Sequence, residues 1–358
     1  MSYVQTVLGP ISPDDLGRVM PHEHLFSLVP GPWLNGGDSD TRVELAANAL
    51  SALPALGFST VVDLSPYGVV GRDADGDNVR DLAEVSRQSG LQIVAGTAVY
   101  LESFSPEWAR TADVDALTER FIRDATVGIG ATGIRAGIFG EQATSLGEIT
   151  AHEEKCLRAV ARAHRATGLG ISTHTTHGTM ALEQIDILRG EGVDLDRVVI
   201  GHMDTHADPA AVRAVLDTGA NIAIDTIGKE VWEFFLGPNP AGRPEGEFTK
   251  RSYYRSDLKR ADLVAELVAE GYVDRVTLAL DLTGAEVWMN PATHGQQGYS
   301  YLARVFIPML QERGVSEEQC ELMLRVNPAR LLTIEGDPTG EAIRRDGIDV
   351  SSEAVSRS

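Results

Sequence analysis

Residues 151–174, AHEEKCLRAVARAHRATGLGISTH, contain the unit from which most of the chain is built. In residues 151–167 apolar side chains recur three and four positions apart, as at Cys156 and Val160, which is typical of an amphipathic helix. A short apolar run follows and ends in His174. The pattern therefore predicts a helix followed by a buried β-strand with a polar residue at its carboxyl end.

The same alternation of short apolar runs and longer helical patterns recurs along the chain. The runs predict eight strands, at 19–24, 60–64, 92–97, 134–139, 170–174, 198–202, 221–225 and 276–281. Alternating strands and helices favour a parallel sheet with helical crossovers, and eight repeats fit an α/β fold of the (β/α)8 TIM-barrel type better than an open sheet. The chain has no P-loop and no Gly-x-Gly-x-x-Gly after its first strand, which disfavours a nucleotide-binding open sheet.

No linker divides the chain, so we expect a single barrel domain over residues 1–334. Residues 335–358 are polar and rich in Ser and Asp, and we expect them to form a C-terminal tail. Residues 238–254, PNPAGRPEGEFTKRSYY, follow the seventh predicted strand and are rich in Pro, Gly and charge. They predict a long loop, whose role the sequence does not specify.

Composition limits the classes of partner. The 358 residues include 31 Lys and Arg against 52 Asp and Glu, a net charge of −21, so the basic surface that nucleic-acid binding requires is missing. No apolar run reaches the roughly 18 residues of a membrane span, and MSYVQTVLGP at the N-terminus lacks a signal-peptide pattern. The two cysteines, Cys156 and Cys320, are far apart. We therefore expect a cytoplasmic protein with a small-molecule substrate and neither nucleic-acid nor membrane partners.

Six side chains of metal-ligand type lie at or just beyond the carboxyl ends of the predicted strands. They are His22, His24, Glu141, His174, His202 and Asp281. In a barrel those ends open on one face, so residues far apart in sequence converge there. Residues i and i+2 of a strand face the same way, so His22 and His24 point inward and Glu23 points away. Imidazole and carboxylate ligands suit zinc, manganese, cobalt or iron.

Charge balance favours two divalent ions over one. Two such ions, the two carboxylates and one hydroxide leave a small net positive charge, which a mostly buried site tolerates. Two ions also need a ligand that touches both, and the carboxylate of Glu141 is the candidate. The pattern thus predicts a binuclear centre, with zinc as the expected ion and manganese or cobalt as alternatives.

These motifs resemble the phosphotriesterase family of the amidohydrolase superfamily. The resemblance is carried by H-E-H at 22–24, T-H-T at 173–175, G-H-M-D at 201–204 and the Asp at the end of the eighth strand, together with G-R-D at 71–73, A-G-I-F-G-E at 136–141, D-T-I-G-K at 225–229 and the stretch 298–310. It extends from Gly9 to about Leu332.

The sequence departs from the best-known members at the bridging ligand. Those enzymes use a carbamylated lysine on the fourth strand, whereas no lysine precedes Lys155 here and Glu141 occupies the corresponding position. The resemblance is therefore to the glutamate-bridged branch of phosphotriesterase-homology and phosphotriesterase-related proteins. It implies that His22, His24 and Asp281 hold the more buried metal. His174 and His202 would hold the more exposed metal, and Glu141 would bridge the two.

The resemblance implies a metal-dependent hydrolase in which a metal-bridging hydroxide attacks a small carboxylic ester or lactone. Asp281 would take the nucleophile's proton and pass it toward the leaving group. Tyr100 ends the third strand and, as in lactone-hydrolysing relatives, would donate to the substrate oxygen; the alternative is a rim aromatic that only packs. Lys229 would pair with an anionic group of the substrate, or else form a surface ion pair.

Several alternatives remain open at this point. An amidase acting on N-acyl amino acids or related amides is the second candidate, and a phosphotriesterase is the third. A ligand-binding barrel without turnover is disfavoured because all six ligand positions carry competent residues. A homodimer is compatible with the resemblance, since relatives are often dimers.

Three further features belong to the surroundings of the centre. Asp204 and His206 follow His202 closely and are candidates for orienting the ligand histidines. Asp63 and the turn at 71–73 are expected to organise the barrel rim.

Overall fold

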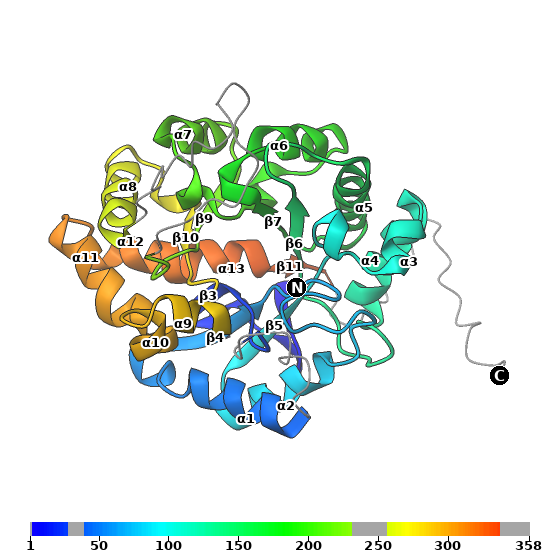
Figure 1. The fold of residues 1–358 in the computed structure, drawn as a ribbon, viewed down its shortest axis with the longest axis horizontal. Helices are drawn as coiled ribbons and strands as arrows, with labels where there is room; N and C mark the ends of the chain where they lie inside the picture. Colours follow the sequence, from blue (N-terminus) through cyan, green and yellow to red (C-terminus); the bar gives the residue numbers. More distant parts are fainter. Residues whose placement is uncertain (1, 28–38, 231–255, 337–358) are drawn as a thin grey trace, which may run out of the picture.

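The computed structural model describes residues 2–27, 39–230 and 256–336 (Figure 1). Eight parallel strands follow one another in sequence order around a nearly closed barrel, with helices outside it. The strands are β3 (Arg18–Glu23), β4 (Phe58–Asp63), β5 (Gln92–Thr97), β6 (Ile138–Thr144), β7 (Ile171–Thr175), β8 (Val198–Ile200), β9 (Asn221–Ile224) and β10 (Val276–Leu278). The predicted single-domain (β/α)8 barrel is confirmed. The predicted loop at 238–254 and residues 337–358 of the predicted tail lie outside the described residues.

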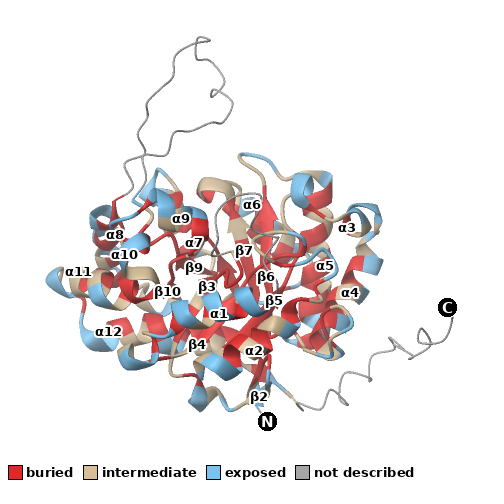
Figure 2. Ribbon diagram, turned by 60° about the horizontal axis from the view of Figure 1, so that its bottom comes forward, coloured by how far each residue is buried: buried red, intermediate tan, exposed pale blue. Residues whose placement is uncertain are grey.

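Helices surround the strands and cover their outer faces. The crossover helices are α1 (Ser39–Leu50), α2 (Val79–Ser89), α4 (Val114–Thr126), α5 (Ala151–Thr167), α6 (Ala181–Gly190), α7 (Pro209–Asp217) and α8 (Asp257–Ala269). The chain continues through α11 (Ile307–Glu312), α12 (Glu317–Glu321) and α13 (Asn327–Leu332), and shorter helices lie at α3 (Glu107–Thr111), α9 (Gly284–Met289) and α10 (His294–Gln297). Buried residues concentrate on the strands and on the inward faces of these helices (Figure 2). No helix among the described residues is long and apolar enough to cross a membrane.

Helix α5 shows why the repeating pattern is helical. Its first turn is closed by a capping box, in which the side chain of Thr150 accepts from Glu153 N–H and the side chain of Glu153 accepts from Thr150 N–H. Gly168, with φ of 75°, adopts the left-handed conformation that ends the helix. Cys156 and Val160 are buried against the barrel, as their spacing predicts.

The fourth strand differs from its prediction. The sequence places it at 134–139, but β6 begins at Ile138 and continues to Thr144. The reason is local: Ala136 N–H donates to the carbonyl of Asp124 at the end of α4, so the chain is held by the helix before it joins the sheet. Consequently Glu141 lies within the strand rather than beyond its end.

A small antiparallel sheet covers the base of the barrel, and the sequence did not predict it. It consists of β1 (Ser2–Thr6), β2 (Gly9–Ile11) and β11 (Ile334–Glu335), with β1 in the middle. Val4 is fully buried and packs in one cluster with the barrel residues Val19 and Val62. Such burial contributes roughly 1.5 kcal/mol. The beginning of the chain thus closes the end of the barrel from which the strands start.

The first and eighth strands are joined partly by a side chain. The buried carboxylate of Glu23 accepts from the backbone N–H groups of Leu280 and Leu282, at 3.0 Å each. Asp281 N–H donates to the carbonyl of His22 at 3.1 Å. Burial raises the pKa of Glu23 to about 8, against the lowering effect of the two backbone donors. As predicted, Glu23 points away from the centre, and it fixes the backbone on both sides of Asp281.

Candidate metal centre

The six predicted ligand residues converge at the carboxyl ends of the strands. His22 lies in β3 with His24 directly after it, Glu141 lies in β6 and His174 in β7. The other two lie beyond their strands, because β8 ends at Ile200 and β10 at Leu278.

His202 and Asp281 share an uncommon backbone conformation. Their φ angles are 57° and 47°, in the left-handed region that non-glycine residues rarely adopt and that costs about 1 kcal/mol or more. Backbone hydrogen bonds hold both residues there. His202 N–H donates to the carboxylate of Asp225, and Asp281 N–H donates to His22, as described above. Such strain at a cluster of ligand-type side chains is typical of a functional site.

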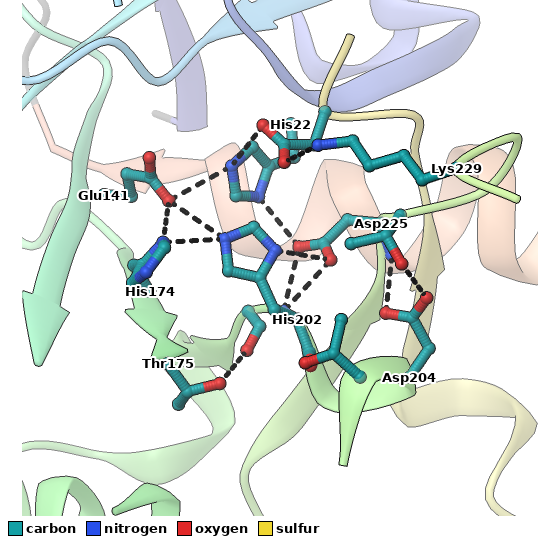
Figure 3. Close-up of polar contacts among 12 residues, drawn as sticks. His22, Glu141, His174, Thr175, His202, Asp204, Asp225 and Lys229 are labelled. Carbon is teal, nitrogen blue, oxygen red and sulfur yellow. Dashed lines mark hydrogen bonds and ion pairs between the residues drawn. The ribbon is translucent and has the colours of Figure 1, made fainter. Parts of the chain in front are cut away.

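The imidazoles of His22, His174 and His202 point toward the carboxylate of Glu141 in Figure 3, and the ring of His24 contacts it as well. Its Oε2 atom lies 3.3 Å from His22 Nε2, 3.2 Å from His174 Nδ1 and 3.4 Å from His202 Nε2. The other oxygen, Oε1, lies 3.5 Å from His24 Nε2. One carboxylate therefore contacts histidines from both of the ligand groups that the sequence predicts.

Asp281 completes the group that contains His22 and His24. Its Oδ1 atom lies 2.9 Å from His24 Nε2 and 3.9 Å from His22 Nε2. The second group consists of Glu141 with His174 and His202, whose facing ring nitrogens are 2.8 Å apart. The geometry brings together every residue predicted as a ligand.

The spacing of these atoms fits a pair of divalent cations. Tetrahedral bonds of about 2.1 Å put ligand atoms about 3.4 Å apart, close to the 3.2–3.5 Å found around Glu141. Within the described residues, both ring nitrogens of the buried His22 lack a hydrogen bond; Nδ1 is in ion-pair contact with Asp225 at 2.9 Å, and Nε2 faces Glu141, where a metal would take its lone pair. The groups His22–His24–Glu141 and Glu141–His174–His202 each bring three donor atoms within 4.8 Å of one another.

Asp225 is a functional residue that the sequence analysis missed. It follows β9, and its carboxylate lies 2.9 Å from Nδ1 of both His22 and His202. The signal for this residue in the sequence is an Asp at the end of the seventh predicted strand, within the D-T-I-G-K motif.

The predicted orienting role of Asp204 and His206 is therefore wrong. Asp204 is paired with Arg260, 2.7 Å away, and accepts from Thr226, so it supports the loop behind Asp225 instead. Within the described part of the chain, the ring of His206 bonds only to the backbone of Asp208.

Against the effect of burial, the buried carboxylates raise the pKa of His22 and His202, whereas burial and the neighbouring His202 lower the pKa of His174. Burial alone would lower the pKa of His202, but Asp225 and Glu141 outweigh burial and raise it to about 10. Burial also opposes ionisation of Glu141, yet the neighbouring histidines hold its pKa well below the usual range. A site that favours protons on buried histidines attracts cations in general, so metal ions and protons compete here.

Tyr100 lies against the centre rather than on an outer rim. Its hydroxyl is 3.3 Å from His174 Nδ1 and 3.4 Å from His174 Nε2, and the two rings meet edge to face. Burial and the nearby carboxylates of Glu141 and Asp281 raise the pKa of Tyr100 well above its usual range. The phenol therefore keeps its proton and can donate a hydrogen bond next to His174.

Lys229 contacts the carboxylate of Asp281 directly through Oδ2, and Glu286 lies 3.8 Å away. It is not the surface ion pair of the alternative interpretation, because only 15% of its side chain is exposed. Burial lowers the pKa of Lys229, but Asp281 and Glu286 outweigh burial and raise it, so the ammonium stays charged.

A buried network holds the loop that carries Lys229. Asp257 accepts from Gly228 N–H at 3.0 Å, and Arg260 donates to the carbonyl of Lys229 at 3.0 Å. At the opposite part of the rim, Asp63 pairs with Arg72 at 2.9 Å and accepts from Leu25 N–H. This agrees with the predicted role of Asp63 and the 71–73 turn in organising the rim.

Comparison with known proteins agrees with this geometry. Residues 2–332 match the Phosphotriesterase family. The phosphotriesterase homology protein of Escherichia coli (strain K12) is 33% identical over 317 residues, covering 88% of this chain and 98% of the relative. The N-acetyltaurine hydrolase of Salmo salar is 29% identical, covering 93% and 98% respectively. A solved structure from the engineering of organophosphate hydrolysis into a weak promiscuous lactonase has a TM-score of 0.75 and 31% identity, covering 92% and 99%.

Proposed function

Because the chain belongs to the phosphotriesterase family of binuclear metal-dependent hydrolases, we propose that it cleaves a small carboxylic ester or lactone at the six-residue centre. The single observation that carries the proposal is the position of Glu141. Its carboxylate lies within 3.2–3.5 Å of all four imidazoles, which suits a ligand shared by two ions. Zinc is the ion we expect, with manganese or cobalt as alternatives.

The proposed ligand sets follow the two groups of contacts. His22, His24 and Asp281 hold one ion, and His174 and His202 hold the other. Glu141 touches both. When bound, the ions supply a water-derived nucleophile at neutral pH and polarise the substrate carbonyl.

The protein's own side chains supply the remaining chemistry. Tyr100, protonated and beside His174, donates a hydrogen bond to the substrate oxygen on which negative charge develops. Asp281 accepts the proton of the attacking water and passes it to the leaving group. Lys229, bound to the same carboxylate, favours its ionised form, so a proton on Asp281 is readily given up.

Hydrolysis of an N-acyl amino acid or a related amide is the second candidate. Two observations favour it: some of the relatives that match over most of the chain are N-acetyltaurine hydrolases, and a buried cation, Lys229, lies beside Asp281. The third candidate, a phosphotriesterase, is favoured only by the solved structures of organophosphorus hydrolases. A homodimer and a cytoplasmic location stay predictions from the sequence.

Reconstitution with metal followed by a substrate panel tests the proposal. The chelator-treated protein should be inactive, should bind two zinc, manganese or cobalt ions per chain, and should then show its highest kcat/KM on a lactone or ester. The panel includes lactones, sugar-derived esters, N-acyl amino acids and a phosphotriester. A preference for N-acyl amino acids would establish the amidase instead, and two bound ions without turnover of any of these compounds would refute both.

Replacement of Lys229 tests whether the substrate carries an anionic group. In Lys229→Ala we expect kcat/KM to fall about ten- to hundred-fold more for substrates with a carboxylate or sulfonate than for neutral ones, because a charge-assisted contact is lost. The ratio between the two substrate types is the readout, since any effect through Asp281 cancels in it. Lys155→Ala is the matched control, because the contacts of Lys155 with the described residues are to backbone carbonyls in and just after α3. An unchanged ratio would remove Lys229 from substrate recognition.

A further inference from the structure

We propose that Asp225 is a positioning residue shared by both metal positions, and that it makes the two ions bind as a pair. The proposal rests on the ligand sets of the proposed function. It goes beyond them because Asp225 is not among the proposed ligands. Its role is to hold one ligand of each ion.

The contacts of Asp225 reach both ligand groups. Its side chain is fully buried and lies on the side of His22 and His202 that is away from Glu141 (Figure 3). Oδ2 lies 2.9 Å from Nδ1 of His22, which belongs to the first group, and Oδ1 lies 2.9 Å from Nδ1 of His202, which belongs to the second. The backbone N–H of His202 also donates to this carboxylate, at 3.0 Å from Oδ1. One carboxylate therefore holds two ligand rings that the proposed function assigns to different ions.

The two rings present opposite nitrogens to Asp225 and to the centre. Nδ1 faces Asp225, while Nε2 of each ring faces Glu141, at 3.3 Å for His22 and 3.4 Å for His202. A carboxylate only accepts hydrogen bonds, so it favours the tautomer with the proton on Nδ1. The lone pair then lies on Nε2, where a metal would be bound. An amide at position 225 has a single acceptor oxygen and can serve only one of the rings.

The other two ligand histidines have separate, uncharged neighbours. Nδ1 of His24 lies 3.2 Å from the hydroxyl of Ser65, and Nε2 of His174 lies 3.4 Å from the hydroxyl of Thr176. Of the residues that the structure describes, Asp225 alone thus contacts the outer nitrogens of two ligand rings. Loss of Ser65 should affect one ligand ring, and loss of Asp225 should affect two.

A direct metal ligand is the competing role for Asp225. Its carboxylate and one nitrogen each of His22 and His202 lie within 4.8 Å of one another, as donor atoms of a metal would. However, both oxygens of Asp225 also lie within 3.1 Å of the backbone N–H of His202. The backbone N–H of His202 carries a partial positive charge. A cation bound between the Asp225 oxygens and the two rings would face this N–H and be repelled by it. The contacts therefore favour orientation of the rings over coordination by Asp225.

The shared carboxylate links the two binding events. An ion bound to Nε2 of His22 fixes that ring and, through it, the carboxylate of Asp225. The same carboxylate then holds His202 in the orientation that the second ion needs. The second ion therefore meets a ring that is already positioned, and both positions should fill over one narrow range of metal concentration.

Titration of the metal-free protein with buffered zinc tests the proposal, with bound zinc per chain as the readout. In the wild type, both zinc ions should bind in a single steep step. In Asp225→Asn the affinity for both should fall by about ten- to hundred-fold, and the two steps should separate because one ring keeps an acceptor. In Ser65→Ala, where one ligand ring loses its outer contact and the Asp225 link is intact, the single step should shift by less than in Asp225→Asn and should not split.

Asp204→Asn is the control for loop distortion. Asp204 is a buried carboxylate of the neighbouring loop that bonds to Arg260, to Thr226 and, at 3.4 Å, to the backbone N–H of Asp225, and among the described residues it contacts no ligand side chain. The proposal would be overturned if Asp204→Asn lost as much zinc affinity as Asp225→Asn. It would also be overturned if Asp225→Asn bound both zinc ions with the same affinities as the wild type. A wild type that binds fewer than two zinc ions would instead refute the proposed centre. If Asp225→Asn does not fold, Asp225→Ser is compared in the same way.

Discussion

Glu141→Ala is expected to lose at least the ion between His174 and His202, and its rate of hydrolysis should fall about a thousand-fold or more. Glu141 contacts all four imidazoles, so its removal leaves both ligand groups without a shared carboxylate. Metal-assisted activation of water and carbonyl supplies several kcal/mol to the reaction, and each 1.4 kcal/mol or so corresponds to a factor of ten in rate.

Bound metal per chain and kcat on the best substrate are measured together for this variant. Glu141→Gln keeps the shape and removes the charge, so it should weaken metal binding more than it disturbs folding. Glu153→Gln is the matched control, because Glu153 is also buried but, among the residues that the structure describes, its carboxylate bonds to Ser145 and Thr150 around the start of α5. Two retained ions and near-normal turnover in Glu141→Ala would show that the bridge is misassigned.

The second large effect is expected for Asp281→Asn, in which kcat should fall about a hundred- to ten-thousand-fold because the proton acceptor is lost. The substitution also strands the buried ammonium of Lys229, whose main partner is the Asp281 carboxylate. Leaving a buried charge unpaired costs about 3–5 kcal/mol of folding free energy. Kinetic assays at saturating metal and thermal unfolding measure the two effects separately.

The double variant Asp281→Asn with Lys229→Met separates stability from catalysis. Removal of both charges should restore much of the stability, since no ammonium remains unpaired. The activity should stay low, because the acceptor is still missing. Full activity in Asp281→Asn with two ions bound would exclude Asp281 as the base.

The barrel and its ligand positions could be predicted from the sequence because both depend on local periodicity. Alternating apolar runs predict strands, and the residue at the end of each run predicts what faces the mouth. His174, at the end of its run, is correctly located on this basis. Glu141 is located less accurately by the periodicity, because the backbone before it is held by the end of α4 and the strand starts later.

Contacts across the barrel could not be predicted in the same way. Asp225 and His22 are separated by most of the chain, and their pairing depends on how the strands close around the centre. The direct contact of Lys229 with Asp281 also depends on loops whose paths no periodicity specifies. The small sheet at the base was missed because its strands are short, and one of them comes from the far end of the described chain.

The position of that small sheet indicates where a tag can be attached without blocking the metal centre. Ser2 pairs with Glu335, so the first strand and the last one leave the fold side by side. The N-terminus lies at the base in Figure 2, away from the carboxyl ends of the barrel strands. A purification tag or a surface anchor attached ahead of Ser2 would therefore leave the substrate entrance open, whereas deletion of residues 2–6 would strip Val4 from the hydrophobic interior.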